Sequence, residues 1–529
     1  MDSFLAIVIV LLILAVADLV VGVSNDAANF LNSAIGSNVA SRKVILTVAS
    51  VGILLGALAS TGMMEIARKG IFNPAYFSFA DVVVIFLAVM LADIILLDLY
   101  NSLGLPTSTT VSIVFELLGA AVMVAWLKIH FGTTDASSIW QMINTSKLGE
   151  IISGIFLSVL IAFSVGAVVM WLARFALTFH FQRAVDRFGS LIAGMAISFI
   201  VYFMLVKGLK GTDLMKGGTG QWIEANIGGV MAATFSLLSV VAFFAQRVLK
   251  VDPLRLIVLA GTFSLAMAFA GNDLVNFIGV PITGLQSFQM WLASGLSADR
   301  FMMGAMADAA HTPTYLLYVA GLVMVLTLWF SAKARKVTET EVNLARQGSG
   351  TEQFRSHLLA RVIVRSAQRA GNLFSTVLGR RNRAIINRRF SGHGTKHADA
   401  PAFDLLRAAM NLMLSSVLIA AATKLKLPLS TTYVTFMVAM GTSLSDRAWG
   451  AESAAQRVAG VLNVIGGWLL TALLAFAAAA IMALLIHFGG NWTGVALFVL
   501  VGAFLVRSHL PRKPRVLEEA AAPDAPVGA

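Results

Sequence analysis

Long apolar runs broken by short polar segments recur along the whole chain. A membrane-spanning helix needs about 20 mostly apolar residues, because the hydrocarbon core of a bilayer is about 30 Å thick. Backbone polar groups in that core must find partners within the protein, so spanning segments of this kind are helical. The pattern predicts an all-α polytopic membrane protein with about twelve transmembrane helices or half-helices. The runs lie near 4–23, 44–63, 82–103, 108–127, 150–178, 190–207, 228–249, 254–271, 303–331, 403–423, 430–445, 457–487 and 491–508.

Composition supports the membrane assignment and narrows the possible chemistry. Apolar residues make up 58% of the 529 residues and charged residues 12%, against about 45–50% and about 25% in soluble domains. Cysteine is absent, which excludes disulfides, thiolate nucleophiles and cysteine-ligated metals. The start of the chain lacks a basic segment, so 4–23 is expected to be a retained helix rather than a cleaved signal peptide. Neither an H-E-x-x-H nor a G-x-S-x-G motif occurs, so we expect no intramembrane enzyme and no cofactor.

The positive charge of the chain is concentrated in one segment. The formal net charge is +12. The stretch 333–400 holds fourteen Lys or Arg and four Asp or Glu, a local balance of +10. Lys- and Arg-rich connections favour the cytoplasmic face of a membrane, so this stretch predicts a cytoplasmic loop and no nucleic-acid partner. Within it, 354–378 is either an interfacial helix on anionic lipid headgroups or a solvated linker.

Two polar motifs occur twice, in the same order. Ser24-Asn25-Asp26-Ala27-Ala28-Asn29-Phe30 returns as Gly271-Asn272-Asp273-Leu274-Val275-Asn276-Phe277, and Leu105-Pro106-Thr107-Ser108-Thr109-Thr110 returns as Leu427-Pro428-Leu429-Ser430-Thr431-Thr432. The two motifs are 81 residues apart in the first copy and 156 in the second, a difference of 75 that is close to the length of the basic stretch. The chain is therefore interpreted as a duplicated unit whose second copy carries an insertion, a pattern typical of secondary transporters.

This duplication predicts how the chain is divided. The expected units are a first repeat core at 1–130, connecting transmembrane helices at 131–253, the first part of the second repeat at 254–332, the basic cytoplasmic insertion at 333–400, the second part of that repeat with the last helices at 401–508, and a disordered tail at 509–529.

The chemistry of the repeated motifs suits an anion carried together with a cation. Asn25, Asp26, Asn272 and Asp273 lie within or at the edge of apolar runs with no Lys or Arg in the motifs. A buried carboxylate is costly unless it is paired or coordinated, and hard oxygen ligands suit Na⁺. Each Ser-Thr-Thr element is expected in the first turn of a helix begun by its proline. Free N–H groups and hydroxyls at two such helix ends could hold a tetrahedral oxyanion without arginine.

Structural interpretations of these motifs remain open. Ser and Thr in membrane helices often bond the preceding turn or a neighbouring helix, and an Asn-Asp pair can cap a helix. The recurrence of both motifs in order favours the functional interpretation. Glu116 lies seven residues after Thr109, on the same helix face; it is either a protonatable coupling or gating group or a carboxyl paired across a helix interface.

The motifs SNDAANF, GNDLVNFIGVP, LPTSTT and LPLSTT resemble the paired G-A-N-D-V-A-N and L-P-x-S-T-T-H signatures of the inorganic phosphate transporter (PiT) family. The resemblance implies a symporter with two inverted-topology repeats and discontinuous helices at the midplane, importing inorganic phosphate with a cation across the bacterial inner membrane, and it makes a homodimer plausible. It implies that phosphate is bound by Ser108, Thr109, Thr110, Ser430, Thr431, Thr432, Asn29 and Asn276, and the coupling cation by Asn25, Asp26, Asn272 and Asp273.

The chain departs from the family pattern at several positions. Ser24 and Gly271 replace the usual Ala before Asn-Asp, and Val111 and Tyr433 replace the usual His after Ser-Thr-Thr. These differences indicate a divergent branch. They leave Na⁺ or H⁺ as the coupling ion, with Na⁺ favoured by the oxygen ligands, and they leave another oxyanion such as sulfate as an alternative substrate.

Overall fold

The computed structural model describes residues 2–60, 70–204, 218–307, 313–346, 379–390, 401–424, 429–446 and 454–509, with a few single residues between 358 and 369. Regular structure in these ranges is helical, apart from two isolated β-bridges. The α-helices are α1 (Asp2–Gly36), α2 (Arg42–Ala59), α3 (Phe79–Leu103), α4 (Thr109–His130), α5 (Ile139–Met142), α6 (Thr145–Leu177), α7 (Gln182–Val201), α8 (Gly218–Ala225), α9 (Ile227–Arg247), α10 (Pro253–Ser294), α11 (Thr314–Phe330), α12 (Ala332–Leu344), α14 (Gly379–Arg389), α15 (Leu405–Lys424), α16 (Thr431–Ser445) and α17 (Ala454–His509), and two 3-10 turns are η3 (Pro74–Tyr76) and η5 (Met303–Ala307).

Within the described residues, the predicted apolar runs broadly coincide with α-helices, except that the start of 303–331 forms the 3-10 turn η5 rather than part of α11. Within the described ranges, nine helices are long and apolar enough to cross a membrane, and a tenth span arises if α11 and α12, bent by 70° at their junction, count together. The helices α1 and α10 continue through their Asn-Asp motifs without a break, so these motifs lie inside helices rather than at helix caps. The runs 457–487 and 491–508 are separated by Gly490, whose φ of 71° interrupts α17.

The breaks in the helices lie before the Ser-Thr-Thr elements. Gly104, with a φ of 73°, ends α3 in the left-handed conformation, which costs glycine little. Ser108 then caps α4, and Ser430 caps α16; each serine accepts a hydrogen bond from the backbone N–H three residues later. The expectation that proline begins the helix is wrong for Pro106, which lies two residues before the cap in a non-helical segment. Pro428 lies outside the described residues.

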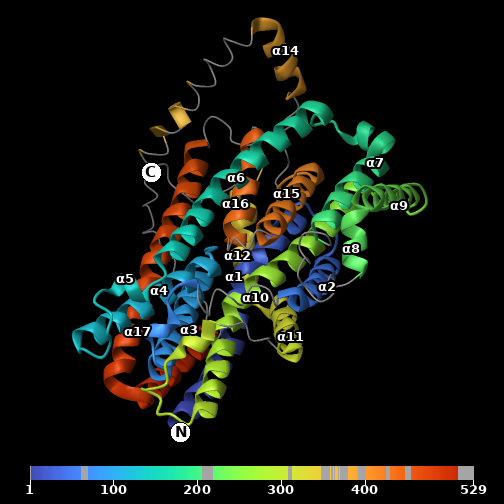
Figure 1. Cartoon of the computed structure of the whole chain (residues 1–529). Coiled ribbons are helices and arrows are strands. Elements are labelled where there is room, and N and C mark those ends of the chain that lie inside the picture. Colours follow the sequence, from blue (N-terminus) through green and yellow to red (C-terminus); the bar gives the residue numbers. More distant parts are fainter. Residues whose placement is uncertain are drawn as a thin grey trace, which may run out of the picture.

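Helices from the first half of the chain pack on helices from the second half. The helix α2 packs on α10, while α11 and α12 pack on α1. Likewise α4 packs along α17 and α16 along α6, as Figure 1 shows. Each half therefore supplies the wall against which the other half's Ser-Thr-Thr helix rests. The buried guanidinium of Arg174 in α6 fixes one of these walls by pairing with Asp446 at the end of α16, at 2.6 Å.

The first part of the basic stretch belongs to the helical core. The Lys333 ammonium in α12 lies 2.6 Å from the Asp98 carboxylate in α3, and the buried Glu341 accepts a hydrogen bond from Asn32 in α1 at 2.6 Å. These pairs attach α12 to the helices that carry the first repeat. Most of 354–378, which the sequence predicts to be an interfacial helix or a solvated linker, lies outside the described residues. So does the predicted disordered tail 509–529, apart from residue 509.

Two equivalent glycines allow the exchanged helices to approach closely. Gly119 in α4 and Gly441 in α16 each lie eleven residues after the capping serine. A Cβ on Gly119 would lie 2.1 Å from the carbonyl oxygen of Phe476 in α17, and one on Gly441 would lie 2.2 Å from that of Phe163 in α6. Backbone atoms cannot yield as a flexible side chain can, so only glycine fits at these contacts.

We therefore predict that Gly119→Ala and Gly441→Ala each destabilise the protein by about 1–3 kcal/mol through overpacking. Gly466→Ala is the matched control, because a Cβ there meets nothing within 4 Å. The measurement is the midpoint of thermal unfolding in detergent. Equal midpoints for all three variants would contradict the close packing.

Candidate functional site

The two Asn-Asp motifs and the two Ser-Thr-Thr motifs meet at one place, where α1, α10, α4 and α16 converge. Asp26 on α1 accepts a hydrogen bond from the Thr109 hydroxyl at 2.9 Å and from the Thr432 hydroxyl at 3.1 Å. Asp273 on α10 accepts one from the Thr110 hydroxyl at 3.3 Å and another from the Thr431 hydroxyl. Each carboxylate is thus held by one threonine from its own half and one from the other half.

The second asparagine of each motif repeats this exchange. The amide of Asn29 donates to the Thr432 hydroxyl at 3.0 Å, and the amide of Asn276 donates to the Thr110 hydroxyl at 3.0 Å. Both contacts run from one half of the chain to the other. The four repeated elements therefore form a single site with two-fold character rather than two separate sites.

The first asparagine of each motif holds the segment that leads into the Ser-Thr-Thr element. The oxygen of Asn25 accepts from the Thr107 backbone N–H at 2.8 Å, and its amide donates to the Asn101 oxygen at 2.8 Å and the Leu105 carbonyl at 3.1 Å. Asn272 donates to the Leu429 carbonyl at 3.4 Å, but its side-chain oxygen is buried without a hydrogen-bond partner among the described residues. Asn25 thus positions α4, whereas Asn272 keeps one oxygen available.

The site is closed to solvent and lacks basic side chains. All twelve motif residues predicted to bind phosphate or cation are at most 6% exposed. No Lys or Arg makes an ion pair with Asp26 or Asp273 in the part of the chain that the structure describes. The two carboxylates act on each other electrostatically, and among the described residues the hydroxyls and amides that bond them are what offsets this repulsion.

Two side chains of the site were not predicted from the sequence. The Thr435 hydroxyl donates to the Asn29 oxygen at 3.3 Å, and Asn101 links Asn25 to the Val21 carbonyl, to which its amide donates at 2.7 Å. Thr435 lies one helical turn after Thr431, so its spacing was a usable signal. Asn101 is a lone polar residue near the end of an apolar run, and nothing in its spacing connects it with Asn25.

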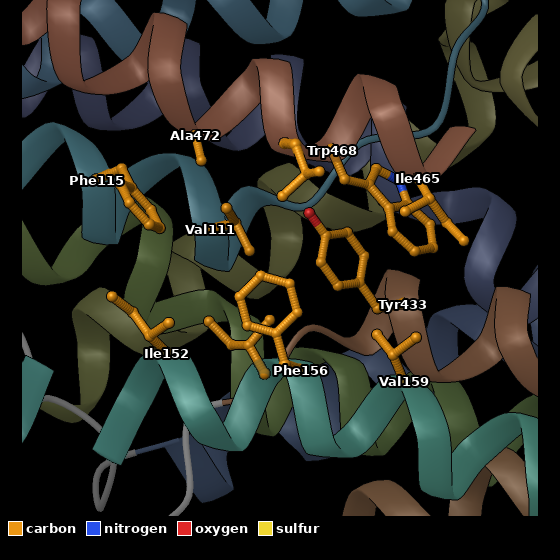
Figure 2. Close-up of a pocket in the computed structure, with 11 residues that line it drawn as sticks. Val111, Phe115, Ile152, Phe156, Val159, Tyr433, Ile465, Trp468 and Ala472 are labelled. Atoms are coloured by element: carbon orange, nitrogen blue, oxygen red, sulfur yellow. The ribbon is translucent and has the colours of Figure 1, made fainter. Parts of the chain in front are cut away.

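The residues that directly follow the two Ser-Thr-Thr elements line an apolar cavity beside the site. Val111 and Tyr433 border this cavity of about 90 Å³ together with side chains from α6 and α17. Figure 2 shows Ile152 and Phe156 of α6 on one side and Ile465 and Ala472 of α17 on the other. The ring of Tyr433 stacks on Trp468 with a centroid distance of 3.8 Å. Both positions that follow the Ser-Thr-Thr elements are therefore surrounded by apolar packing.

Glu116 lies apart from the motif site. It is fully buried in α4, and its Oε1 accepts a hydrogen bond from the Ser112 hydroxyl at 2.7 Å. The carboxyl of Asp93 in α3 acts on it electrostatically. The alternative of a carboxyl paired with a base across a helix interface finds no support among the described residues.

The chain is similar in sequence to a known protein family and to several named proteins. A model described as the phosphate transporter family matches residues 22–341. A protein named "Putative phosphate permease" in Pyrococcus furiosus is 23% identical over 368 residues, covering 67% of this chain and 80% of that protein. Its namesake in Thermococcus kodakarensis is 27% identical over 305 residues, covering 55% of this chain and 70% of that protein.

A solved structure shares the fold. "The sodium-dependent phosphate transporter" superposes with a TM-score of 0.63 at 15% sequence identity, covering 91% of this chain and 99% of that chain. The family match spans both Asn-Asp motifs and the first Ser-Thr-Thr element. The chain therefore belongs to the phosphate transporter family.

Proposed function

We propose that this protein is a secondary active symporter that imports inorganic phosphate together with a cation. Its family consists of transporters rather than enzymes, and the chain is a multi-pass membrane protein. The observation that carries the proposal is the buried network in which four threonine hydroxyls from the N-termini of two helices bond two carboxylates, with no arginine or lysine of the described residues paired to them.

Phosphate binding would use the donors that now serve the carboxylates. The N-termini of α4 and α16 carry partial positive charge and N–H groups that lack partners within the helix. Phosphate oxygens entering between them could accept hydrogen bonds from Thr109, Thr110, Thr431 and Thr432, with the capping serines 108 and 430 adding their hydroxyl protons. The amides of Asn29 and Asn276 already bond these threonines and would turn toward the same anion.

The cation would be held by Asp26 and Asp273, with Asn25 and Asn272 at its edge. The unpartnered, buried oxygen of Asn272 fits a cation ligand, since an unsatisfied buried acceptor is otherwise costly. Oxygen donors of this type suit Na⁺, and the fold shared with a sodium-dependent phosphate transporter supports Na⁺ over H⁺. The cation would also explain coupling, because two ionised carboxylates would repel phosphate until their charge is neutralised.

The setting of the protein is part of the same proposal. Import would take place across the plasma membrane of a bacterium, in contact with the lipid bilayer, with the part of 333–400 beyond α12 on the cytoplasmic side. The helices α6, α7 and α9 expose broad apolar faces, which are available to lipid or to a second copy in a homodimer. No cofactor beyond the coupling ion is proposed.

Uptake into proteoliposomes tests substrate and coupling together. We predict that radiolabelled phosphate accumulates under an imposed Na⁺ gradient, more slowly under an imposed H⁺ gradient, and that excess sulfate leaves this uptake unchanged. Sulfate uptake that excess phosphate does not inhibit would make sulfate the substrate. If phosphate accumulates only under the H⁺ gradient, the ion bound by the two carboxylates is H⁺ rather than Na⁺.

We predict that Asp26→Asn and Asp273→Asn each reduce gradient-driven phosphate uptake to the level of empty liposomes, because an amide cannot neutralise the cation. Neither change should unfold the protein, since each removes one of two buried charges that repel each other. The exposed carboxylate Asp186 on α7 provides the control variant Asp186→Asn, which should transport normally. Near-normal uptake by Asp26→Asn would remove this residue from the cation site.

We predict that Thr109→Ala and Thr431→Ala weaken phosphate affinity about 10–100-fold, since a hydrogen bond to a charged group contributes about 1.5–3 kcal/mol. Thr262→Ala is the matched control: this buried threonine of α10 bonds only its own helix, donating to the Val258 carbonyl at 2.8 Å. Binding is measured by titration calorimetry in saturating Na⁺. An equal loss in all three variants would indicate a general packing effect.

A further inference from the structure

Three buried carboxyls form a second group outside the motif site. Asp18 on α1, Asp93 on α3 and Glu116 on α4 are at most 1% exposed, and α3 packs on both α1 and α4. Asp18 lies eight residues before Asp26 and Glu116 seven residues after Thr109. At 1.5 Å per residue, each is about two helical turns from the motif site, along the same helices.

We refer to Asp18, Asp93 and Glu116 as the carboxyl cluster. Their contacts indicate that the cluster binds protons. Asp93 is within hydrogen-bonding reach of Asp18, Glu116 and Ser112. Yet both oxygens of Asp18, Oδ1 of Asp93 and Oε2 of Glu116 are buried with no donor among the described residues. Ionised carboxylates only accept hydrogen bonds, so two of them at this range bond each other only when one carries a proton. Asp18 is fully buried, and its carboxyl can bond that of Asp93 only when one of the two is protonated.

Neighbouring helices supply no counter-charge to the carboxyl cluster. Among the described residues, no Lys, Arg or His makes an ion pair with any of the three carboxyls. Asp273 of α10 acts on Asp26, Lys333 of α12 pairs with Asp98, Lys128 at the end of α4 pairs with Asp81, Arg407 of α15 donates to the Ala345 carbonyl, and His487 of α17 stacks on Phe131.

A metal ion is also a poor fit for the cluster. Within the described residues, no three acidic, histidine or cysteine side chains are grouped so that they could hold a metal together. The cluster is therefore a chain of pairwise contacts rather than a coordination shell. Three buried carboxylates left ionised without a positive partner would be costly, so protons are the ligand that remains.

We propose that Asp18, Asp93 and Glu116 form a proton-binding site linked to phosphate uptake, in addition to the cation site at Asp26 and Asp273. This inference rests on the proposed phosphate symport. The charge of Asp18 acts on Asp26, so a protonated cluster makes the neighbouring motif site less negative and favours the entry of an anion. Because linkage is reciprocal, bound phosphate favours protonation of the cluster, and protons cross with the substrate.

The test uses the full-length protein in proteoliposomes at saturating Na⁺, with a pH-sensitive dye in the lumen. Wild-type uptake should fall by up to about tenfold per pH unit as the pH rises, the limit for one linked proton, and protons should enter with phosphate. The triple variant Asp18→Asn/Asp93→Asn/Glu116→Gln should still take up phosphate but move fewer protons per phosphate. Taking the ratio of variant to wild-type uptake at each pH removes the titration of phosphate itself.

Two further variants keep the test decisive. Glu116→Gln alone retains an oxygen that can accept from Ser112, so it should fold even if the triple variant does not, and it should lower the proton-to-phosphate ratio. The control Asp98→Asn/Lys333→Gln removes a buried carboxyl of α3 together with its partner and should keep the wild-type pH profile.

The outcomes separate the two proposals. Absence of wild-type phosphate uptake under any gradient would overturn the proposed function. Normal uptake by wild type and Glu116→Gln, with identical pH profiles and identical proton movement, would overturn the carboxyl cluster alone. An equal change in the control variant would also overturn it, because the pH dependence would then follow any loss of a buried carboxyl.

Discussion

The cost of burying two carboxylates inside a membrane protein governs the arrangement of this structure. Asp26 and Asp273 lie fully buried without a basic partner among the described residues, and only hydroxyl and amide donors meet them. The hydroxyl donors come from the first turns of α4 and α16, where backbone N–H groups are also free. The first turns of the two Ser-Thr-Thr helices therefore meet at the two carboxylates, and α17 and α6 pack along these helices.

The exchange of helices between the halves meets this requirement. Each Ser-Thr-Thr helix packs along a long helix of the other half, α4 on α17 and α16 on α6, with a glycine at the closest approach. The same exchange appears in the hydrogen bonds, where each carboxylate takes one threonine from each half. Directly after the two Ser-Thr-Thr elements, Val111 and Tyr433 line an apolar cavity, so the polar contacts of the site are made by the motif residues before them.

The sequence predicted the helical spans, the duplication and the residues that converge, because repeated polar motifs in apolar runs are visible without coordinates. It did not predict contacts that depend on how helices face each other. Asn101 and the neighbourhood of Asp18, Asp93 and Glu116 arise only from the packing of α1, α3 and α4. Lys333 and Glu341 counted as part of a basic loop, yet their partners Asp98 and Asn32 hold them in the core. Composition gives the charge of a segment but not the partners of its charged side chains. Pro106 does not begin α4, because Ser108, two residues later, caps this helix.

The span of chain between the two partners of Asp26 has a consequence for biogenesis. Thr109 is made soon after Asp26, but Thr432 is 406 residues away in the sequence, and the wall that supports α4 belongs to α17, near the end of the chain. At translation rates of about 5–20 residues per second, Asp26 spends tens of seconds in the membrane with half of its donors missing. The first half can therefore insert but not close, and assembly of the transport site must wait for the last helices to leave the ribosome.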